Sequence, residues 1–242
     1  MGWGAVYQTK STGGRWALNE QQLHINALEM KAAFFALQTF CQSLRDQHVR
    51  VMIDNTTAVT YINNMGGSHS AICNSLAREI WFWCIDRNLW ISAAHLSGTS
   101  NVAADKASRV FCDRTEWKLD ESITAYFYRP KIDLFASRLN YQLLRYVAWQ
   151  PDPGAETVYA FTLDWHSDTF FAFPPFSLLG RVVQKIEDDQ AEGILVAPNW
   201  PTQPWYPNLM RLLVREPLML PKGKHLLKLP YNPEQNHPCI QS

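Results

Sequence analysis

Proline is so unevenly distributed along this chain that its two parts cannot share one architecture. All fourteen prolines of the 242 residues stand at or after Pro130, and residues 1–129 contain none. Because proline interrupts helices and central strands, the proline-free part suits long regular elements and the remainder suits short ones. We therefore predict two domains that meet near 115–131. The expected division is a first domain over 1–114, a linker over 115–130, a second domain over 131–216, and a C-terminal hairpin and tail over 217–242.

Composition and charge indicate a folded protein without pointing to a partner. The chain is 47% hydrophobic and 13% aromatic, which is too apolar for a disordered protein. Its 22 basic and 22 acidic residues cancel, so bulk charge favours neither nucleic acid nor a membrane surface. The longest apolar run, 80–85, is far shorter than the roughly 20 residues of a membrane span, and no leader pattern follows Met1.

Cysteine usage predicts a reducing compartment. The five cysteines are widely spaced and form no C-x-x-C pair, which argues against a disulfide framework or a zinc site. We expect reduced thiols and an intracellular protein, in the cytoplasm or nucleus. These cysteines are Cys41, Cys73, Cys84, Cys112 and Cys239.

The first part alternates strand and helix patterns. Trp3–Gln8 and Arg15–Leu18 flank the glycine-bearing stretch 9–14 and predict a β-hairpin. Apolar residues at three-to-four spacing predict a helix from Asn26 to about Leu44, entered through Asn26. The remaining expected elements are a strand at 49–54, helices at 56–63 and 70–86, a strand at 90–95 and a short helix at 102–109. This order predicts an α/β fold with a mixed sheet covered by helices.

The second part is less regular. We expect strands at 169–173 and 193–196, a helix at 177–189 and another after Trp205. Near the end, 218–220 and 226–229 flank a turn-forming stretch and predict a hairpin.

Three carboxylates lie at strand ends or near helix starts, which are positions where α/β proteins commonly place functional residues. Glu29 lies in the first turn of the long helix, Asp54 ends a strand, and Asp105 lies near the start of the last short helix. Strand ends and helix starts at one sheet edge can converge. Several such oxygen ligands around two Mg²⁺ ions about 3.5–4 Å apart would form a phosphodiester-hydrolysing site.

Each acid also has a structural interpretation that the sequence leaves open. Glu29 follows Asn26 at capping-box spacing, so it could satisfy a backbone N–H at the helix start. Asp54 could cap the helix that follows it. Asp105 could pair with the basic residue one or four positions later.

Four short sequence motifs, taken in order, resemble those of a known family. They are Gly-Trp-Gly-Ala-Val at 2–6, His-Ile-Asn-Ala-Leu-Glu-Met-Lys-Ala at 24–32, Met-Ile-Asp-Asn at 52–55, and the stretch from His95 to Arg109. Their order and spacing resemble the ribonuclease H domain that follows reverse transcriptase in retroelements, most closely in DIRS-like, tyrosine-recombinase retrotransposons. The resemblance covers residues 1 to about 112.

The resemblance implies an activity and a site. Glu29, Asp54 and Asp105 correspond to three of the family's four metal-binding carboxylates, and His95 to its mobile histidine. The family hydrolyses the RNA strand of RNA–DNA hybrids with Mg²⁺ (or Mn²⁺), so the implied partners are such a hybrid and the reverse transcriptase part of a parent polyprotein. Alternatively, His95 simply ends a strand and bonds backbone. We assign Asn101 to helix capping.

The family pattern also contains an acid that this sequence does not show. In the family an Asp-bearing strand precedes the Gly-Trp-Gly-Ala word, which here directly follows Met1. We therefore expect a ribonuclease H-like mixed sheet that lacks its first strand, a truncated element, and impaired hydrolysis. The alternative is an inactive remnant that acts at most as a nucleic-acid or protein binding module.

The second part resembles the segment that follows ribonuclease H in DIRS-like elements, which is similar to phage-type Dam adenine methyltransferases. The motifs that carry this resemblance are Ile-Asp-Leu-Phe-Ala-Ser at 132–137, Asp-Trp at 164–165, the stretch 171–177 and the stretch 194–206. In those enzymes an Asp/Asn-Pro-Pro-Tyr/Phe loop holds a flipped adenine. The corresponding residues here are Phe173, Pro174, Pro175 and Phe176.

This loop departs from the methyltransferase pattern at its first position. A phenyl ring at Phe173 cannot accept the adenine amino hydrogen bond, and no glycine-rich loop for S-adenosylmethionine is evident. We therefore expect a degenerate, Rossmann-like α/β domain that does not bind S-adenosylmethionine. Adenine methylation remains the alternative, and a rigid turn is the structural interpretation of the two prolines.

Overall fold

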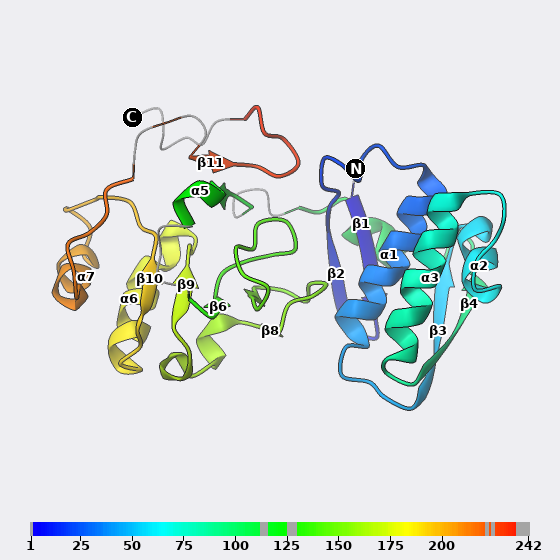
Figure 1. Cartoon of the computed structure of the whole chain (residues 1–242), viewed down its shortest axis with the longest axis horizontal. Coiled ribbons are helices and arrows are strands. Elements are labelled where there is room, and N and C mark those ends of the chain that lie inside the picture. The colour runs from blue at the N-terminus through cyan, green and yellow to red at the C-terminus, as the bar shows by residue number, and fades with distance from the viewer. Residues whose placement is uncertain (1, 112–115, 125–129, 221–222, 224–225, 236–242) are drawn as a thin grey trace. The chain divides into compact units, whose positions relative to one another are not determined.

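The chain divides into two compact units in a computed structural model that describes residues 2–111, 116–124, 130–220, 223 and 226–235 (Figure 1). Unit 1 comprises Met1–Phe111 with Pro151–Pro153, and unit 2 comprises Cys112–Gln150 with Gly154–Ser242. Part of the stretch that we assigned to a linker, 116–124, contains regular elements and lies in unit 2. Two of the predicted thiols, Cys112 and Cys239, lie outside the described residues, whereas Cys41, Cys73 and Cys84 are free and buried.

Unit 1 contains helices and two separate sheets. Strands β1 (Gly2–Tyr7) and β2 (Lys10–Arg15) pair antiparallel, and β3 (Gln47–Ile53) and β4 (Leu89–His95) pair parallel. The helices are α1 (Ile25–Phe40), α2 (Thr56–Asn63), α3 (Ala71–Ile85) and α4 (Val102–Ala107). The α/β class is confirmed, but in place of one mixed sheet that lacks its first strand there are two separate sheets, since β1 and β3 are not hydrogen-bonded to each other.

The hairpin turn lies earlier than the sequence predicts. Gln8 and Thr9 form it, with Gln8 in the left-handed region at φ +56°, and β2 already ends at Arg15. Gly13 and Gly14 are therefore strand residues. A Cβ on Gly13 would lie 2.6 Å from the carbonyl oxygen of Ala107 in α4, so the glycine allows close packing of a helix rather than a turn.

Helix α1 is the centre of unit 1 and packs on both sheets. It is capped by His24, whose Nδ1 accepts from the Asn26 N–H at 3.2 Å, and it ends at Phe40. The predicted start at Asn26 and end near Leu44 are therefore wrong. One face of α1 contributes Leu28 and Phe35 to a cluster with Trp3 and Trp16 from the hairpin. The opposite face enters a larger core, shared with β3, β4, α2 and α3, through Ala27, Met30, Ala33 and Leu37.

Unit 2 is built around a three-stranded parallel sheet in the order β10-β9-β6. Its strands are β6 (Ile132–Asp133), β9 (Phe170–Ala172) and β10 (Gly193–Leu195). Two further pairs are β7 (Val147–Ala148) with β8 (Thr157–Val158), parallel, and β5 (Lys118–Leu119) with β11 (Leu227–Lys228), antiparallel. The helices are α5 (Glu121–Thr124), α6 (Leu179–Asp188) and α7 (Tyr206–Leu212), with short 3₁₀ turns at Ala160–Thr162, Trp165–Ser167 and Phe176–Leu178.

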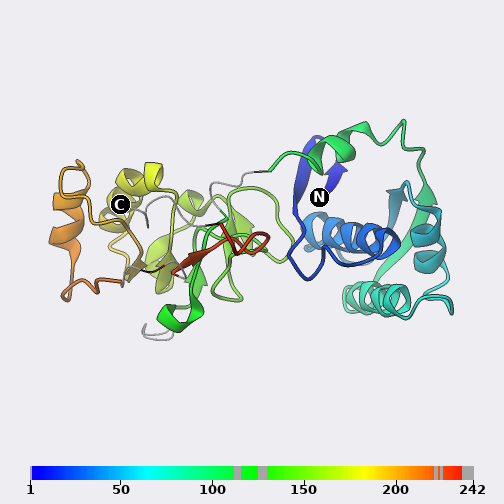
Figure 2. The ribbon, with the colours of Figure 1, turned by 90° about the horizontal axis from the view of Figure 1, so that it is seen from above.

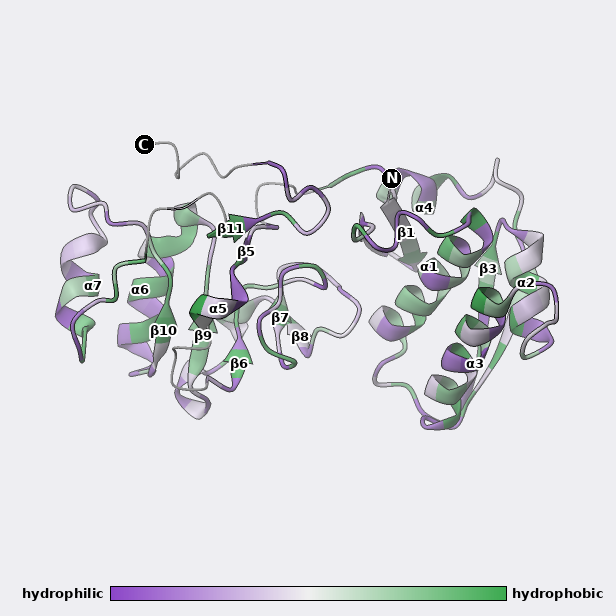
Figure 3. Ribbon diagram, turned by 45° about the horizontal axis from the view of Figure 1, so that its top comes forward, coloured by the Kyte–Doolittle hydropathy of each residue, from purple (hydrophilic) through white to green (hydrophobic). Residues whose placement is uncertain are grey.

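Most predicted elements of unit 2 are confirmed, and one is wrong. Strands β9 and β10 and helices α6 and α7 lie where the sequence predicts them. The expected C-terminal hairpin does not form, because 218–220 has no strand and β11 pairs instead with β5. That pairing buries Leu119, Leu227 and Leu229 against Phe171. Helix α6 displays both hydrophobic and hydrophilic residues and buries Leu179, Val182 and Val183 (Figure 3).

Within the described residues, no helix has the length and apolar character that crossing a membrane requires.

Candidate active site

Glu29 is not a capping residue. Because α1 begins at Ile25 with His24 as its cap, Glu29 lies in the second turn, and the capping-box interpretation is wrong. The side chain is half-buried. Burial, and to a smaller extent the nearby charge of Asp54, together raise the pKa of Glu29 from 4.5 to about 6. Glu29 and Asp54 therefore lie close enough for their charges to interact.

Asp54 follows the last residue of β3 and is exposed. The helix after it is capped by Asn55, whose Oδ1 accepts from the Ala58 N–H at 2.9 Å, so Asp54 does not act as the cap. Asn55 also donates to Asn26 Oδ1 at 2.9 Å. This amide pair ties the start of α1 to the start of α2, and so holds Glu29 beside Asp54.

Helix α4 packs on the β1-β2 hairpin, and its start lies beside Asp54. Asn101 stands at its N-cap position, but its side chain caps nothing and instead donates to Asp54 Oδ2 at 3.1 Å. Our assignment of Asn101 to capping is therefore wrong. Asp105 lies one turn further along α4 and is exposed, and Arg109 binds it with an N–O distance of 2.8 Å. The ion pair that we considered for Asp105 is confirmed.

His95 completes the set of predicted site residues. It is the last residue of β4, stands opposite Ile53 in the parallel register, and is exposed. The Leu96 N–H donates to the Ile53 carbonyl at 2.9 Å, which holds the two strand ends together. His95 therefore ends at the same sheet edge as Asp54, and its ring makes no hydrogen bond within the described part of the chain.

As placed, the described residues offer two carboxylates to a metal ion rather than three. Across the described residues, no group of three or more His, Cys, Asp and Glu side chains could hold a metal ion. Glu29 and Asp54 offer the oxygen ligands that Mg²⁺ prefers, but Asp105 is neutralised by the guanidinium of Arg109. The site is thus a carboxylate pair with a third acid engaged elsewhere.

Asp54→Asn is expected to lower the pKa of Glu29 towards its ordinary value. The amide removes the neighbouring negative charge, and the remaining elevation is that due to burial. Carboxyl ¹³C NMR titration of the full chain measures the effect. The matched control is Asp105→Asn, which removes an acid whose partner is Arg109 and should leave Glu29 unchanged. An equal shift in both variants contradicts the pairing of Glu29 with Asp54.

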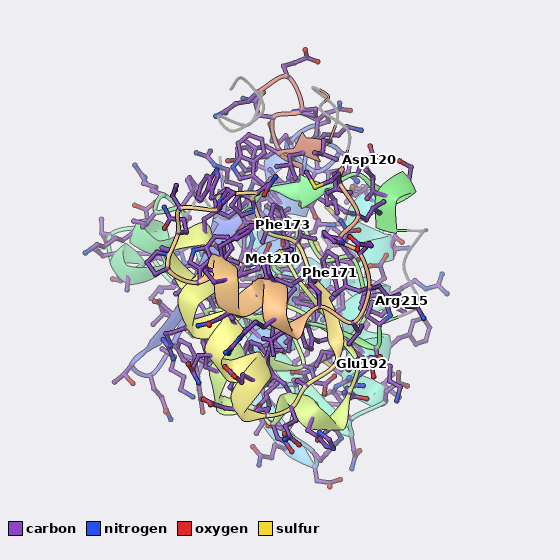
Figure 4. The ribbon with its side chains drawn as sticks, turned by 90° about the vertical axis from the view of Figure 1, so that its left-hand side faces the viewer. Asp120, Phe171, Phe173, Glu192, Met210 and Arg215 are labelled. Atoms are coloured by element: carbon purple, nitrogen blue, oxygen red, sulfur yellow. The ribbon has the colours of Figure 1, made fainter. Side chains whose placement is uncertain are left out.

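The second candidate loop leaves a buried strand in unit 2, as predicted. Strand β9 is fully buried and runs directly into Phe173-Pro174-Pro175-Phe176, beside parallel β10. Phe173 packs with the cluster that contains Phe171, and Phe176 meets Trp200 edge-on with ring centroids 5.3 Å apart. Figure 4 labels Phe171 of β9, Phe173 of the loop after it, and Met210 of α7. The side chain at the first position of the loop thus contributes an apolar contact and no hydrogen-bond acceptor.

Asp133 is a buried acid that the sequence patterns do not single out as a candidate. This residue ends β6, is 2% exposed, and accepts from the Gln142 N–H at 3.0 Å and the Phe135 N–H at 3.4 Å. Burial raises its pKa from 3.8 to about 7, and the two backbone donors only partly oppose that rise. The sequence pattern that could have indicated it is an acid between Ile132 and Leu134 in an otherwise apolar stretch.

Comparison of the chain with family models, with curated proteins and with solved structures gives no significant match.

Proposed function

We propose that unit 1 is a ribonuclease H-like domain of retroelement origin that acts weakly on the RNA strand of RNA–DNA hybrids. The observation that supports this proposal is the meeting of Glu29 and Asp54, where α1, the end of β3 and the start of α4 come together. The exposed ring of His95, at the neighbouring strand end, is available for proton transfer. The reverse transcriptase part of a parent polyprotein is the proposed partner chain.

The chain's own residues limit the activity. Asn101 orients Asp54, burial holds part of Glu29 in its protonated form near pH 6, and Arg109 competes with any cation for Asp105. Mg²⁺ or Mn²⁺ is the proposed cofactor. Because the described carboxylates do not form a three-ligand group, we expect hydrolysis to be slow at best.

Cleavage of a labelled RNA–DNA hybrid by the full chain tests this proposal. We expect weak cleavage that requires Mg²⁺ or Mn²⁺ and disappears in Asp54→Asn, because that substitution removes half of the carboxylate pair. Arg109→Ala frees Asp105 and should increase the rate. Cleavage that Asp54→Asn leaves unchanged would come from a contaminant, and a chain that neither cleaves nor binds the hybrid contradicts the proposal.

A nucleic-acid binding module without catalysis is the second candidate. The ion pair between Asp105 and Arg109 favours it, since it occupies an acid that hydrolysis would need. Hybrid binding that persists in EDTA, without cleavage in any metal, would select this candidate over the first.

For unit 2 we propose descent from an adenine methyltransferase without its activity. The support is the position of the Pro174-Pro175 turn at the carboxyl end of β9, where open α/β sheets bind their ligands. Phe173 offers no acceptor for an adenine amino group, and S-adenosylmethionine is not a proposed cofactor.

A further inference from the structure

Alternate residues of β3 and β4 form a sheet face that the helices do not cover. The other residues of these strands enter the core of unit 1, and they are Val49, Val51, Ile53, Leu89, Ile91 and Ala93. Helices α1 and α3, which lie side by side in Figure 2, contribute to the same core. Because side chains alternate along a strand, the residues between those six lie on the opposite face. On that face His48, Arg50, Met52 and Trp90 are exposed.

Trp90 is an exposed ring that is nevertheless held in position. With 58% of its surface accessible, it is the most exposed of the ten tryptophans. The ring of Trp81 in α3 packs against it nearly edge-on, with centroids 5.0 Å apart and planes at 65°. Trp81 is itself fixed, since its indole N–H donates to the Ile62 carbonyl at 2.8 Å. Trp90 therefore offers a stacking surface that costs little side-chain entropy to use.

Arg50 places an unpaired cation next to this ring. It stands opposite Ser92 in the parallel register, so its Cα lies roughly 8 Å from that of Trp90 on the same face. Within the described residues its guanidinium makes no hydrogen bond and no ion pair. The other arginines of unit 1 all have a partner in the described chain, and they are Arg15, Arg45, Arg78, Arg87 and Arg109.

The face has basic and hydroxyl groups but no acid. Neither β3 nor β4 contains Asp or Glu. His48 stands opposite Trp90, and its Nε2 is 3.0 Å from Ser92 Oγ. The acids that flank β3, Asp46 and Asp54, accept hydrogen bonds from the side chains of Asn88 and Asn101. An exposed aromatic ring beside an unpaired guanidinium complements a base and its phosphate.

The outer edge of β4 does not offer a competing site at this position. The side-chain amide of Asn63 bonds to both the N–H and the C=O of Ala93. An extended peptide cannot pair with β4 there while Asn63 is in place. A ligand of this part of unit 1 therefore meets the side chains of the face and not the backbone of the edge.

We propose that the Trp90 face, defined by His48, Arg50, Trp90 and Ser92, binds single-stranded nucleic acid. One base stacks on the exposed ring of Trp90, and Arg50 binds the adjoining phosphate. His48 and Ser92 supply hydrogen-bonding groups for the sugar or phosphate. A single strand is preferred because a duplex conceals the faces of its bases. The proposal goes beyond the hydrolysis proposed above, since it uses neither the carboxylate pair nor a metal ion.

Fluorescence anisotropy of a labelled oligothymidylate of about 12 nucleotides, titrated with the full chain in EDTA, tests the proposal. We expect saturable binding with a dissociation constant on the order of 10 µM at low salt. A duplex of the same length should bind roughly tenfold more weakly. Trp90→Ala should weaken binding of the single strand roughly tenfold through loss of one stacked base, whereas Trp90→Phe keeps a ring and should remain within about threefold of the parent.

Two control variants match these changes. Phe82 of α3 is equally exposed, at 58%, so Phe82→Ala should leave the affinity unchanged. Arg50→Ala should weaken binding and reduce the slope of log affinity against log salt by roughly 0.7, the value for one phosphate of a single strand. Arg78→Ala changes the net charge equally and should do neither. Because Arg50 is exposed and unpaired within the described chain, its substitution tests the face without disturbing the packing of Trp81.

NMR of the ¹⁵N-labelled chain locates the bound strand. The indole N–H of Trp90, identified by its absence from Trp90→Phe, should shift when the oligothymidylate binds. Absence of saturable binding, equal affinity of the parent and Trp90→Ala, or an equal loss in Phe82→Ala would overturn the proposal. A dimer that forms through Trp90 without nucleic acid would assign the face to a second copy and would also overturn it. Binding by a chain that does not cleave hybrids would support this proposal and contradict only the proposed hydrolysis.

Discussion

Asp133→Asn is expected to remove a large pH dependence from the stability of unit 2. In the folded chain the pKa of Asp133 is raised to about 7 by burial, whereas the ordinary value is 3.8. Well below pH 3.8 the acid is protonated in both states, and the folded state carries no penalty. As the pH rises from 4 to 7, the unfolded chain ionises first, so stability is lost progressively, by roughly 4 kcal/mol in all.

Urea unfolding of the full chain between pH 4 and 8 measures this effect as a difference between parent and variant. The parent should lose stability across that interval relative to Asp133→Asn, whose amide cannot ionise. The exposed acid Asp188 provides the matched control, since Asp188→Asn should follow the parent at every pH. If the parent and Asp133→Asn differ by a constant amount throughout, Asp133 does not titrate as its burial implies.

The second large effect is expected at Gly4. A Cβ there would lie 2.5 Å from the Ser108 nitrogen and 2.9 Å from the Ala107 carbonyl carbon, and it would also meet the Ala104 carbonyl oxygen. These are backbone atoms of α4 and its C-terminal end, so no side chain can move aside. Gly4→Ala should therefore separate the hairpin from α4 and destabilise unit 1 by roughly 3 kcal/mol.

Gly98→Ala is the control for this substitution, because nothing lies within 4 Å of a Cβ at Gly98. Thermal unfolding should show a large decrease for Gly4→Ala and almost none for Gly98→Ala. Displacement of α4 should also break the bond from Asn101 to Asp54, which NMR of the Asn101 side-chain amide would report. Similar stability of the two variants would mean that α4 does not pack on the hairpin.

The sequence predicts elements better than their contacts, and the hairpin illustrates why. Glycines at 13 and 14 are typical of a turn, but both lie in β2, and at Gly13 the close packing of α4 explains why a glycine stands in the strand. The start of α1 has a similar cause. Asn26 is a good cap, but its side chain bonds to Asn55, 29 residues away, and His24 caps the helix instead. Local patterns cannot reveal such long-range partners.

The candidate site was predictable only in part. The positions of Glu29 and Asp54 follow from helix and strand patterns, and their proximity was expected from the sheet edge that they share. The contact from Asn101 to Asp54 was not predictable, since the same residue at the same position usually caps a helix. Asp133 was missed because its burial depends on packing that no local pattern specifies.

The amide of Asn63 has a consequence for self-association. Exposed strand edges are where folded chains recruit copies of themselves into fibres, and fibre growth requires two free edges on each sheet. The side-chain amide of Asn63 accepts from the Ala93 N–H and donates to the Ala93 carbonyl, both at 2.8 Å, so no further strand can pair with β4 at Ala93. Loss of the Asn63 amide would leave the N–H and C=O of Ala93 open to pairing with another chain.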